Sequence, residues 1–415
     1  MQIADLHLHS SYSRATSKDM TIHEMAKGAK TKGINILGTG DFTHPRWIED
    51  LKIMLKSGDD GSGLYGYEGI KFALTGEISL IFGQDKKTRK VHNVLLAPNF
   101  EVVDQINEFL RKKGRLDYDG RPIFGFSCIE LADELMKISK DIMIIPAHAW
   151  TPYFGILGSM SGFDSVEECF KEKTKYIHAL ETGLSSDPVM NWRVSSLDKF
   201  SLVSFSDAHS PYSWRLGREA CVFSEVANYK NMIDAIIDHK GFSFTVETQP
   251  EYGKYHNDGH RFCNVNLTPD EAKKVNNICP KCHKPLTIGV AHRVEELADR
   301  PPGYVPKDAV PFKSLIPLME IIAAVEQTGM VTKNVNAIYN ILLNRFGSEF
   351  NILLNAEMNE LKKLVKEKLA LAIIKNREGK LKVIPGYDGV YGKPNLDSIE
   401  EDKPSAKNKG LGSFV

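Results

Sequence analysis

The sequence predicts an α/β fold: a barrel of alternating strands and helices, followed by a cysteine-rich module and a helical extension. Short apolar runs alternate with helical segments in the first half, most of these runs end in a histidine or a carboxylate, and three cysteines crowd between positions 263 and 282. A chain of 415 residues has room for about two to three folding units. We expect the barrel at 1–250, the cysteine-rich module at 251–300, a helical domain at 301–395 and a flexible tail at 396–415.

The expected elements of the barrel follow one another in a regular order. Residues 2–6 form the first strand candidate, and Thr21-Ile-His-Glu24 fits a capping box that opens a helix which Gly33 can close. Ser127-Cys-Ile-Glu130 fits a second capping box. Further strands are expected at the apolar runs 34–37, 72–74, 91–96, 142–145, 176–180 and 202–205. Strands that alternate with helices in this way indicate a parallel sheet closed into a barrel.

Most of these strands end in a side chain that can bind a metal or move a proton. These side chains are His7, His9, Asp41, Glu77, His148, Glu181, Asp207 and His209. In a barrel of parallel strands the carboxyl ends converge on one face, so we expect the groups to share one pocket. His7 and His9 are two positions apart on a strand, so both imidazoles face the same side.

A metal centre is favoured over an ordinary polar core for this pocket. Histidine and carboxylate ligands suit zinc and manganese, and His92 lies near the start of another apolar run. Burial of so many polar groups without a cation would cost about 1–3 kcal/mol for each unpaired group. Divalent ions such as Zn²⁺, Mg²⁺ or Mn²⁺ lower the pKa of bound water and clamp phosphate oxygens, so hydrolysis of a phosphate ester is the expected reaction.

The cysteine cluster has the spacing of a structural zinc site. Its expected ligands are His260, Cys263, Cys279 and Cys282. Three cysteines and one histidine close a tetrahedral shell and leave no open position for a substrate. His256 and His283 are alternative fourth ligands, while His260 is favoured by its spacing.

The composition restricts the classes of function. The chain has 53 basic and 53 acidic residues, so it has no overall positive field and a nucleic acid would have to bind to a local patch. No apolar run is long enough to span a bilayer, and the first residues carry no secretory signal, so we expect a cytoplasmic protein with no membrane partner. Val335, Ile338, Leu342 and Phe346 keep a helical period in the extension.

The ligand pattern resembles the motifs of the polymerase-and-histidinol-phosphatase (PHP) superfamily. The matching segments are His7-Leu-His9-Ser, Gly-Asp41, Glu77, Pro-Ala-His148 and Ser-Asp207-Ala-His209. The resemblance implies a distorted β/α barrel with up to three metals and phosphoesterase activity. It also implies two ligand sets that share Glu77 as a bridge: His7, His9, Glu77 and Asp207 for one metal, and Glu77, His92 and His148 for the second.

The same resemblance implies individual roles. The expected catalytic residues are Asp207, His148 and Glu77. His209 would belong to a third site, in which His44 substitutes for the histidine that many relatives carry where this chain has Phe42. Asp41 and Glu181 are expected either to bind a metal or to orient a histidine, and the orienting role is favoured for Glu181.

Longer segments resemble the endonuclease Q family of this superfamily. They are residues 40–47, 148–155, 207–215 and 279–290, and the similarity runs from residue 1 to about residue 394. This resemblance implies a DNA repair endonuclease that cuts 5′ of uracil, hypoxanthine, xanthine or an abasic site. A PHP-type phosphatase of a small phosphomonoester such as histidinol phosphate is the alternative, and a non-catalytic adaptor for DNA or a clamp is a third hypothesis.

Several aromatic and arginine side chains near the metal motifs are candidates for DNA contact. They are Trp150, Tyr153, Phe154, Trp214 and Arg215. Such groups can stack on bases or bind phosphates, while packing at the rim of the barrel explains each of them equally well.

The last eight residues, 408–415, resemble the peptide that binds the sliding clamp (PCNA). Leu411 and Phe414 occupy two anchor positions, while Asn408 and Val415 depart from the usual pattern. The clamp is therefore an expected partner besides damaged DNA.

Overall fold

One mixed sheet organises the barrel. The computed structural model describes residues 1–55 and 59–395, so the expected clamp peptide at 408–415 lies outside the described residues. Within these ranges the main sheet has ten strands in the order β14-β11-β10-β1-β2-β4-β5-β7, and β3 and β6 each pair with β4. The strands are β1 (Gln2–Asp5), β2 (Ile36–Gly38), β3 (Tyr65–Tyr67), β4 (Ile70–Gln84), β5 (Lys87–Ala97), β6 (Ile123–Phe124), β7 (Met143–Pro146), β10 (Ala220–Phe223), β11 (Phe242–Glu247) and β14 (Phe312–Ser314).

The sheet curls into a distorted barrel. β8 (Ala179–Glu181) and β9 (Ser201–Val203) form a separate parallel pair. Single bridges join Ile144 to Ile177, beside β7, and Leu8 to Ala208, beyond β1. These bridges place the β8–β9 pair between β7 and the segment after β1. The pair therefore links the two sides of the curled sheet. The predicted barrel-like α/β fold is confirmed.

The expectation of a parallel sheet was wrong for half of the barrel. β1, β2 and β4 are parallel, but β4 and β5 form a long antiparallel hairpin whose register runs from Leu74↔Ala97 to Gln84↔Lys87. Asp85 and Lys86 make its turn with φ of 52° and 61°, as a two-residue type I′ turn requires. The usual glycine at the second turn position is absent, so the sequence carries no clear signal for this hairpin.

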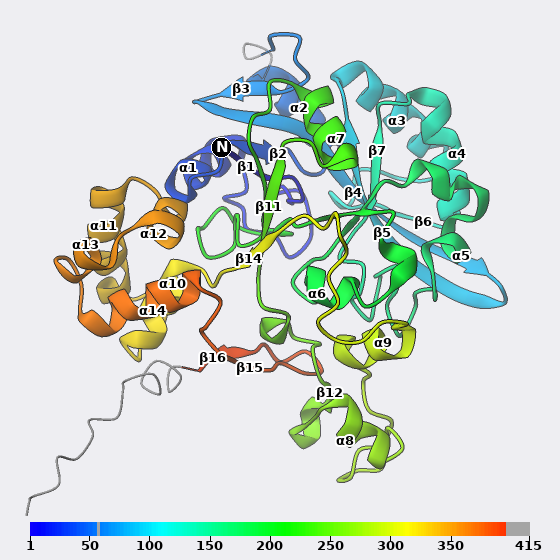
Figure 1. Cartoon of the computed structure of the whole chain (residues 1–415). Helices are drawn as coiled ribbons and strands as arrows, with labels where there is room; N and C mark the ends of the chain where they lie inside the picture. Colours follow the sequence, from blue (N-terminus) through cyan, green and yellow to red (C-terminus); the bar gives the residue numbers. More distant parts are fainter. Residues whose placement is uncertain (56–58, 396–415) are drawn as a thin grey trace, which may run out of the picture.

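Helices cover the outside of the curled sheet (Figure 1). They are α1 (Ile22–Lys32), α2 (Pro45–Leu55), α3 (Phe100–Lys113), α4 (Cys128–Ile138), α5 (Val166–Phe170), α6 (Pro188–Asn191) and α7 (Tyr229–Asp238). Thr21 and Ser127 cap α1 and α4 as predicted, and Gly33 ends α1 with a left-handed φ of 94°. Among the described residues, no helix has both the length and the apolar character needed to cross a membrane.

Two further units lie against the barrel. The cysteine-rich module contains β12 (Asp258–His260), β13 (Val265–Leu267), α8 (Pro269–Lys274) and α9 (Val290–Leu297). The extension contains α10 (Leu318–Val325), α11 (Lys333–Phe346), α12 (Glu349–Asn355), α13 (Met358–Lys362) and α14 (Glu367–Arg377), and Figure 1 shows it on the side of α1. Four short 3₁₀ helices are described, at Lys171–Tyr176, Ser195–Leu197, Pro250–Tyr252 and Arg261–Cys263.

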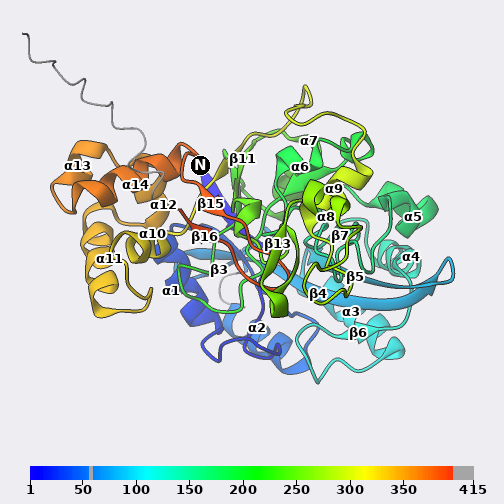
Figure 2. The same cartoon turned by 90° about the horizontal axis from the view of Figure 1, so that it is seen from below.

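The end of the described chain returns to the cysteine-rich module. β15 (Val383–Ile384) and β16 (Lys393–Pro394) pair with each other; they lie below the barrel in Figure 1 and cross its near side in Figure 2. The N–H of Gly386 donates to the carbonyl of Glu251 (2.8 Å), and the N–H of Asn257 donates to the carbonyl of Gly386 (3.0 Å). The extension is therefore joined to the module by backbone hydrogen bonds as well as by the chain itself.

Candidate metal centre

The residues that follow β1, the middle of β4 and the loop after β9 meet at one buried point. His7, His9, Glu77 and Asp207 each offer a ligand atom, and these four atoms lie within 4.8 Å of one another. His9 Nε2 lies 3.1 Å from both Glu77 Oε2 and Asp207 Oδ1. His7 Nε2 lies 3.4 Å from Glu77 Oε2 and 3.6 Å from Asp207 Oδ1. One small volume is thus surrounded by two imidazoles and two carboxylates.

A second ligand set shares Glu77 with the first. His92 Nδ1 lies 2.8 Å and His148 Nε2 lies 3.4 Å from Glu77 Oε1, the other oxygen of the same carboxylate. Glu77, His92 and His148 together form a second group with the spacing of metal ligands. Since Glu77 turns one oxygen to each group, it has the geometry of a bridging ligand.

Two buried carboxylates hold the histidines in place. Asp41 Oδ1 lies 3.0 Å from Nδ1 of His9, while Asp41 Oδ2 accepts hydrogen bonds of 2.6 Å from both the N–H and the hydroxyl of Ser10. Glu181 Oε1 lies 2.9 Å from Nδ1 of His7, and Glu181 Oε2 accepts the backbone N–H of His148 (2.6 Å). Because a carboxylate contacts Nδ1 of His7 and of His9, Nε2 of these two imidazoles faces the centre.

The atoms that converge on the centre lack hydrogen-bond partners. His7 Nε2, His9 Nε2, Glu77 Oε1 and Asp207 Oδ1 are buried without a hydrogen bond among the described residues. An unsatisfied buried polar atom costs about 1–3 kcal/mol, so four such atoms around the Glu77 carboxylate are a large penalty unless cations satisfy them. The donor set therefore fits divalent metal ions.

Backbone strain supports the same assignment. Asp41, His148 and Asp207 have positive φ values of 50°, 32° and 47°, which side chains other than glycine rarely adopt. Such conformations cost energy and concentrate at functional sites, because the surrounding structure must hold them. All three lie in loops that follow strands of the barrel.

Electrostatics keep the carboxylates ionised. Burial opposes ionisation of Glu77, but Arg121, His92 and His7 outweigh it and hold the Glu77 pKa well below its ordinary range. Burial likewise opposes ionisation of Asp207, but His7, His9 and His209 hold its pKa well below the usual value. In contrast, burial lowers the pKa of His92 to about 4, so this imidazole is neutral and able to bind a metal.

The structure does not bring the residues expected at a third site into either ligand group. His44 is buried and its ring stacks on Tyr12 with a centroid distance of 4.5 Å. His209 directs Nδ1 to the backbone carbonyl of Asp207 (2.9 Å), and its ring lies 4.5 Å from that of His9. His209 Nδ1 also lies 3.7 Å from Asp207 Oδ1, and the roles of His44 and His209 as ligands of a third site stay predictions.

The candidates for DNA contact divide into a buried and an accessible set. Trp150 is completely buried and its Nε1 donates to Asn191 Oδ1 (2.8 Å), so the expectation of a DNA contact is corrected: Trp150 is part of the core. Tyr153 is 41% exposed, and half-buried Phe154 packs on the His92 ring at 4.3 Å. Trp214 and Arg215 are half-buried, and Trp214 stacks on the exposed Tyr212 ring at 4.7 Å.

Arg121 is a site residue that the sequence analysis missed. Its Nη1 donates to Glu77 Oε2 (3.0 Å), and the side chain keeps 29% of its surface exposed. Glu77 raises the pKa of Arg121 further above its ordinary value, so the guanidinium stays charged beside both ligand sets. No motif marks this arginine, because only the fold brings the loop before β6 to the centre.

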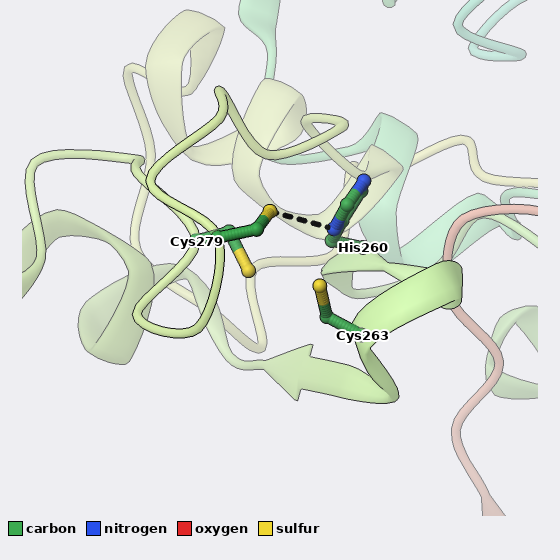
Figure 3. Close-up of side chains that lie close together, drawn as sticks. His260, Cys263 and Cys279 are labelled. Atoms are coloured by element: carbon green, nitrogen blue, oxygen red, sulfur yellow. Dashed lines mark hydrogen bonds between the residues drawn. The ribbon is translucent and has the colours of Figure 1, made fainter.

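The cysteine cluster forms a separate group with the spacing of metal ligands (Figure 3). The ligand atoms of His260, Cys263, Cys279 and Cys282 lie within 4.8 Å of one another, and His260 Nδ1 is 3.3 Å from Cys282 Sγ. Burial opposes ionisation of Cys279, but backbone N–H groups of Cys282 and Lys281 lower its pKa to about 6. Neither His256 nor His283 is part of this group.

The fold and the shared histidine–carboxylate site define a metallohydrolase of the PHP class. A lesion-specific endonuclease from Pyrococcus furiosus has a solved structure that is 32% identical, covers 97% of each chain and has a TM-score of 0.86. Endonuclease Q in complex with a 27-mer duplex carrying an abasic lesion at the active site is also 32% identical, covers 98% of this chain and 100% of its own, and has a TM-score of 0.86. The chain therefore belongs to the endonuclease Q family of metal-dependent DNA endonucleases.

Two curated relatives and one family model are consistent with this membership. Protein MJ0043 of Methanocaldococcus jannaschii is 34% identical over 68% of this chain, which spans only 34% of that relative's length. Protein YqxK of Bacillus subtilis is 27% identical over 94% of this chain and 98% of its own length. Residues 317–380 match the family model of the MJ0043 C-terminal domain, which places that domain in the helical extension.

Proposed function

We propose that this chain is a DNA repair endonuclease that hydrolyses the phosphodiester bond 5′ of uracil, hypoxanthine or xanthine and of abasic sites. The observation that carries the proposal is that His7 Nε2, His9 Nε2 and Asp207 Oδ1, buried without hydrogen-bond partners among the described residues, converge on Glu77, whose other oxygen faces His92 and His148. This site lies in a chain that is similar, over almost its whole length, to an endonuclease Q bound to a duplex with an abasic lesion.

The ligand sets assign roles to the residues of this chain. In the proposal, His7, His9, Glu77 and Asp207 hold one divalent ion, and Glu77, His92 and His148 hold another. Zn²⁺, Mg²⁺ or Mn²⁺ would supply Lewis acidity toward the phosphate oxygens and a lower pKa for an attacking water. Glu77 sets the separation of the two ligand sets, and Asp207 and His148 complete the catalytic group on either side of it.

The remaining residues position the substrate and the ligands. Asp41 and Glu181 fix the tautomer and direction of His9 and His7, as carboxylates that contact ligating histidines commonly do. The Arg121 guanidinium is partly exposed beside Glu77 and can offer hydrogen bonds to a non-bridging oxygen of the scissile phosphate. The Arg121 guanidinium would then help the metal ions to neutralise the negative charge of the phosphate.

The cysteine cluster is proposed to bind one structural Zn²⁺ through His260, Cys263, Cys279 and Cys282. A closed tetrahedral shell leaves no position for a substrate, so this site would stabilise the module rather than take part in hydrolysis. Binding of the sliding clamp by residues 408–415 and a cytoplasmic location stay predictions.

The proposal is tested with labelled duplexes that carry uracil, hypoxanthine, xanthine, an abasic analogue or no damage. We expect a nick 5′ of each lesion, dependence on added divalent metal, and a loss of at least a thousandfold in Asp207→Asn and His148→Ala. Asp234→Asn and His178→Ala are matched controls, because these residues lie outside both ligand groups. Full nicking by the two site variants would overturn the catalytic assignment.

Two other outcomes would replace the proposal. Rapid release of phosphate from histidinol phosphate, without a nick in any duplex, would identify a small-molecule phosphatase. Binding of damaged duplex without cleavage in Mg²⁺, Mn²⁺ and Zn²⁺ would identify a non-catalytic adaptor.

A further inference from the structure

A basic cavity lies beside the metal centre and belongs to neither ligand set. It has a volume of about 630 Å³, and its wall includes Tyr12, Arg14, Lys18, His44, Arg46 and Tyr118. Ser13, also in the wall, has its hydroxyl 3.2 Å from Nδ1 of His9, and Nε2 of the same imidazole faces the metal centre, so the Ser13 and His9 side chains connect the cavity to the centre. A ligand in this cavity would therefore lie near the metal centre.

The charge of the cavity is positive. Three cations line it, and Asp117, the only acidic side chain in its wall, is held by the Arg115 guanidinium through contacts of 2.9 and 3.1 Å. Lys18 and Arg46 are exposed, and neither forms an ion pair within residues 1–55 and 59–395. Arg14 lies 3.6 Å from Asp119 but keeps 73% of its side chain exposed. The wall therefore presents cations whose charges are largely free for a ligand.

Two further features point to a polar ligand. His44 is only 5% exposed, yet its Nδ1 has no hydrogen-bond partner among the described residues. Arg46 lies in the first turn of α2, which begins at Pro45 in the same wall, so the positive end of that helix faces the cavity. An unpartnered buried nitrogen and a helix N-terminus both favour phosphate over an apolar group.

We propose that this cavity binds backbone phosphates of the DNA strand next to the scissile phosphate, with Arg46 and Lys18 as the main contacts. The inference rests on the proposed function, and it names the part of the substrate that the basic wall holds. Contacts to phosphates set the register of a protein on DNA without reading its sequence. A fixed register is what an enzyme needs if it must place one chosen bond over its metal centre.

Arg46→Ala and Lys18→Ala test the cavity on the uracil duplex. We expect KM to rise roughly tenfold in either variant, as expected for one charge-assisted hydrogen bond, and the slope of log affinity against log salt to decrease by about 0.9 for each lost contact. Arg111→Ala is the matched control, because Arg111 is an exposed arginine on α3 outside the cavity. If Arg46→Ala and Lys18→Ala behave like Arg111→Ala, the proposal is wrong.

Single methylphosphonate substitutions in the cut strand locate the phosphate that is bound. Neutralising that phosphate should weaken binding by wild-type protein roughly tenfold and should have no further effect in Arg46→Ala, because the shared contact is already lost. If the loss of affinity from the methylphosphonate and the loss from Arg46→Ala multiply at every position, no backbone phosphate contacts Arg46 and the inference fails.

The two proposals can fail separately. Binding is measured by fluorescence anisotropy in the Asp207→Asn background, so the cavity is tested even if wild-type protein cuts no duplex. If wild-type protein cuts no duplex but Arg46→Ala reduces the affinity for the duplex, the endonuclease proposal is rejected and the phosphate site is kept. Normal nicking with unchanged affinity in Arg46→Ala would do the reverse.

Discussion

The ammonium of Lys32, at the end of α1, lies 2.7 Å from Glu349 Oε1 on α12, although 317 positions separate the two residues. Both side chains are buried, with 1% and 0% of their surfaces exposed. Lys32 also donates to the carbonyl of Ser213 (2.7 Å), and Glu349 accepts hydrogen bonds from Tyr339 Oη (2.7 Å) and the N–H of Leu318 (3.0 Å). This ion pair joins the barrel, the loop after Asp207 and the helical extension at one point.

Lys32→Met should lower the free energy of unfolding by about 3–5 kcal/mol, because it leaves the Glu349 carboxylate buried without its cation. Chemical denaturation in urea measures the loss. Lys112→Met is the control, since Lys112 forms an exposed ion pair with Glu108 and such pairs contribute about 1 kcal/mol or less. Equal stability of the two variants would show that the buried pair does not hold the extension to the barrel.

Asp41→Asn should weaken divalent metal binding by about 10–100-fold, because an amide orients the imidazole of His9 less strongly than a carboxylate does. Calorimetric titration with Mn²⁺ measures the affinity. Asp104→Asn, which changes an exposed partner of Lys52, should leave the affinity unaltered. Wild-type affinity in Asp41→Asn would argue against the orienting role.

Cys279→Ser should remove one bound zinc per chain and make the module sensitive to protease. The module has a small core of Val265, Ala272 and Leu286 around Cys279, so metal binding must supply much of its stability. Elemental analysis and limited proteolysis report the two effects. Cys221→Ser, at a buried thiol in β10, should keep the metal content, and retention of zinc by Cys279→Ser would exclude this cysteine as a ligand.

Glu247→Gln should change how stability depends on pH. Burial raises the pKa of Glu247 from an ordinary 4.5 to about 7. The folded protein therefore favours the protonated acid, and this contribution to stability is complete below about pH 4.5 and is lost as the pH rises through 7. Between pH 5 and 8 the wild type should lose stability relative to Glu247→Gln, on the order of a few kcal/mol.

Thermal unfolding at several pH values measures this difference. The amide keeps the contacts of the side chain with Thr245 and Thr182 but cannot ionise. Glu225→Gln, at an exposed position, is the matched control and should follow the wild type. A constant difference between wild type and Glu247→Gln at every pH would mean that Glu247 does not titrate in this range.

Local sequence patterns were sufficient to predict several features of the site and of the fold. His7 and His9 share a face because backbone geometry repeats every two residues in extended chain, and Cys279 and Cys282 can chelate one ion because a two-residue spacer closes the loop. The caps at Thr21 and Ser127 were equally readable, since they depend on neighbours three positions away. Each of these signals lies within a few residues of the feature it predicts.

The sequence by itself determined the ligand types, the helix caps and the barrel-like α/β class, because short-range geometry and residue chemistry control them. Only the tertiary structure decided that β4 and β5 pair antiparallel, that Trp150 is buried and that Arg121 reaches Glu77. The tertiary structure also decided the Lys32–Glu349 ion pair and the basic cavity. These features arise from contacts between distant segments, whose free energy depends on burial and on neighbouring charges that no local window contains.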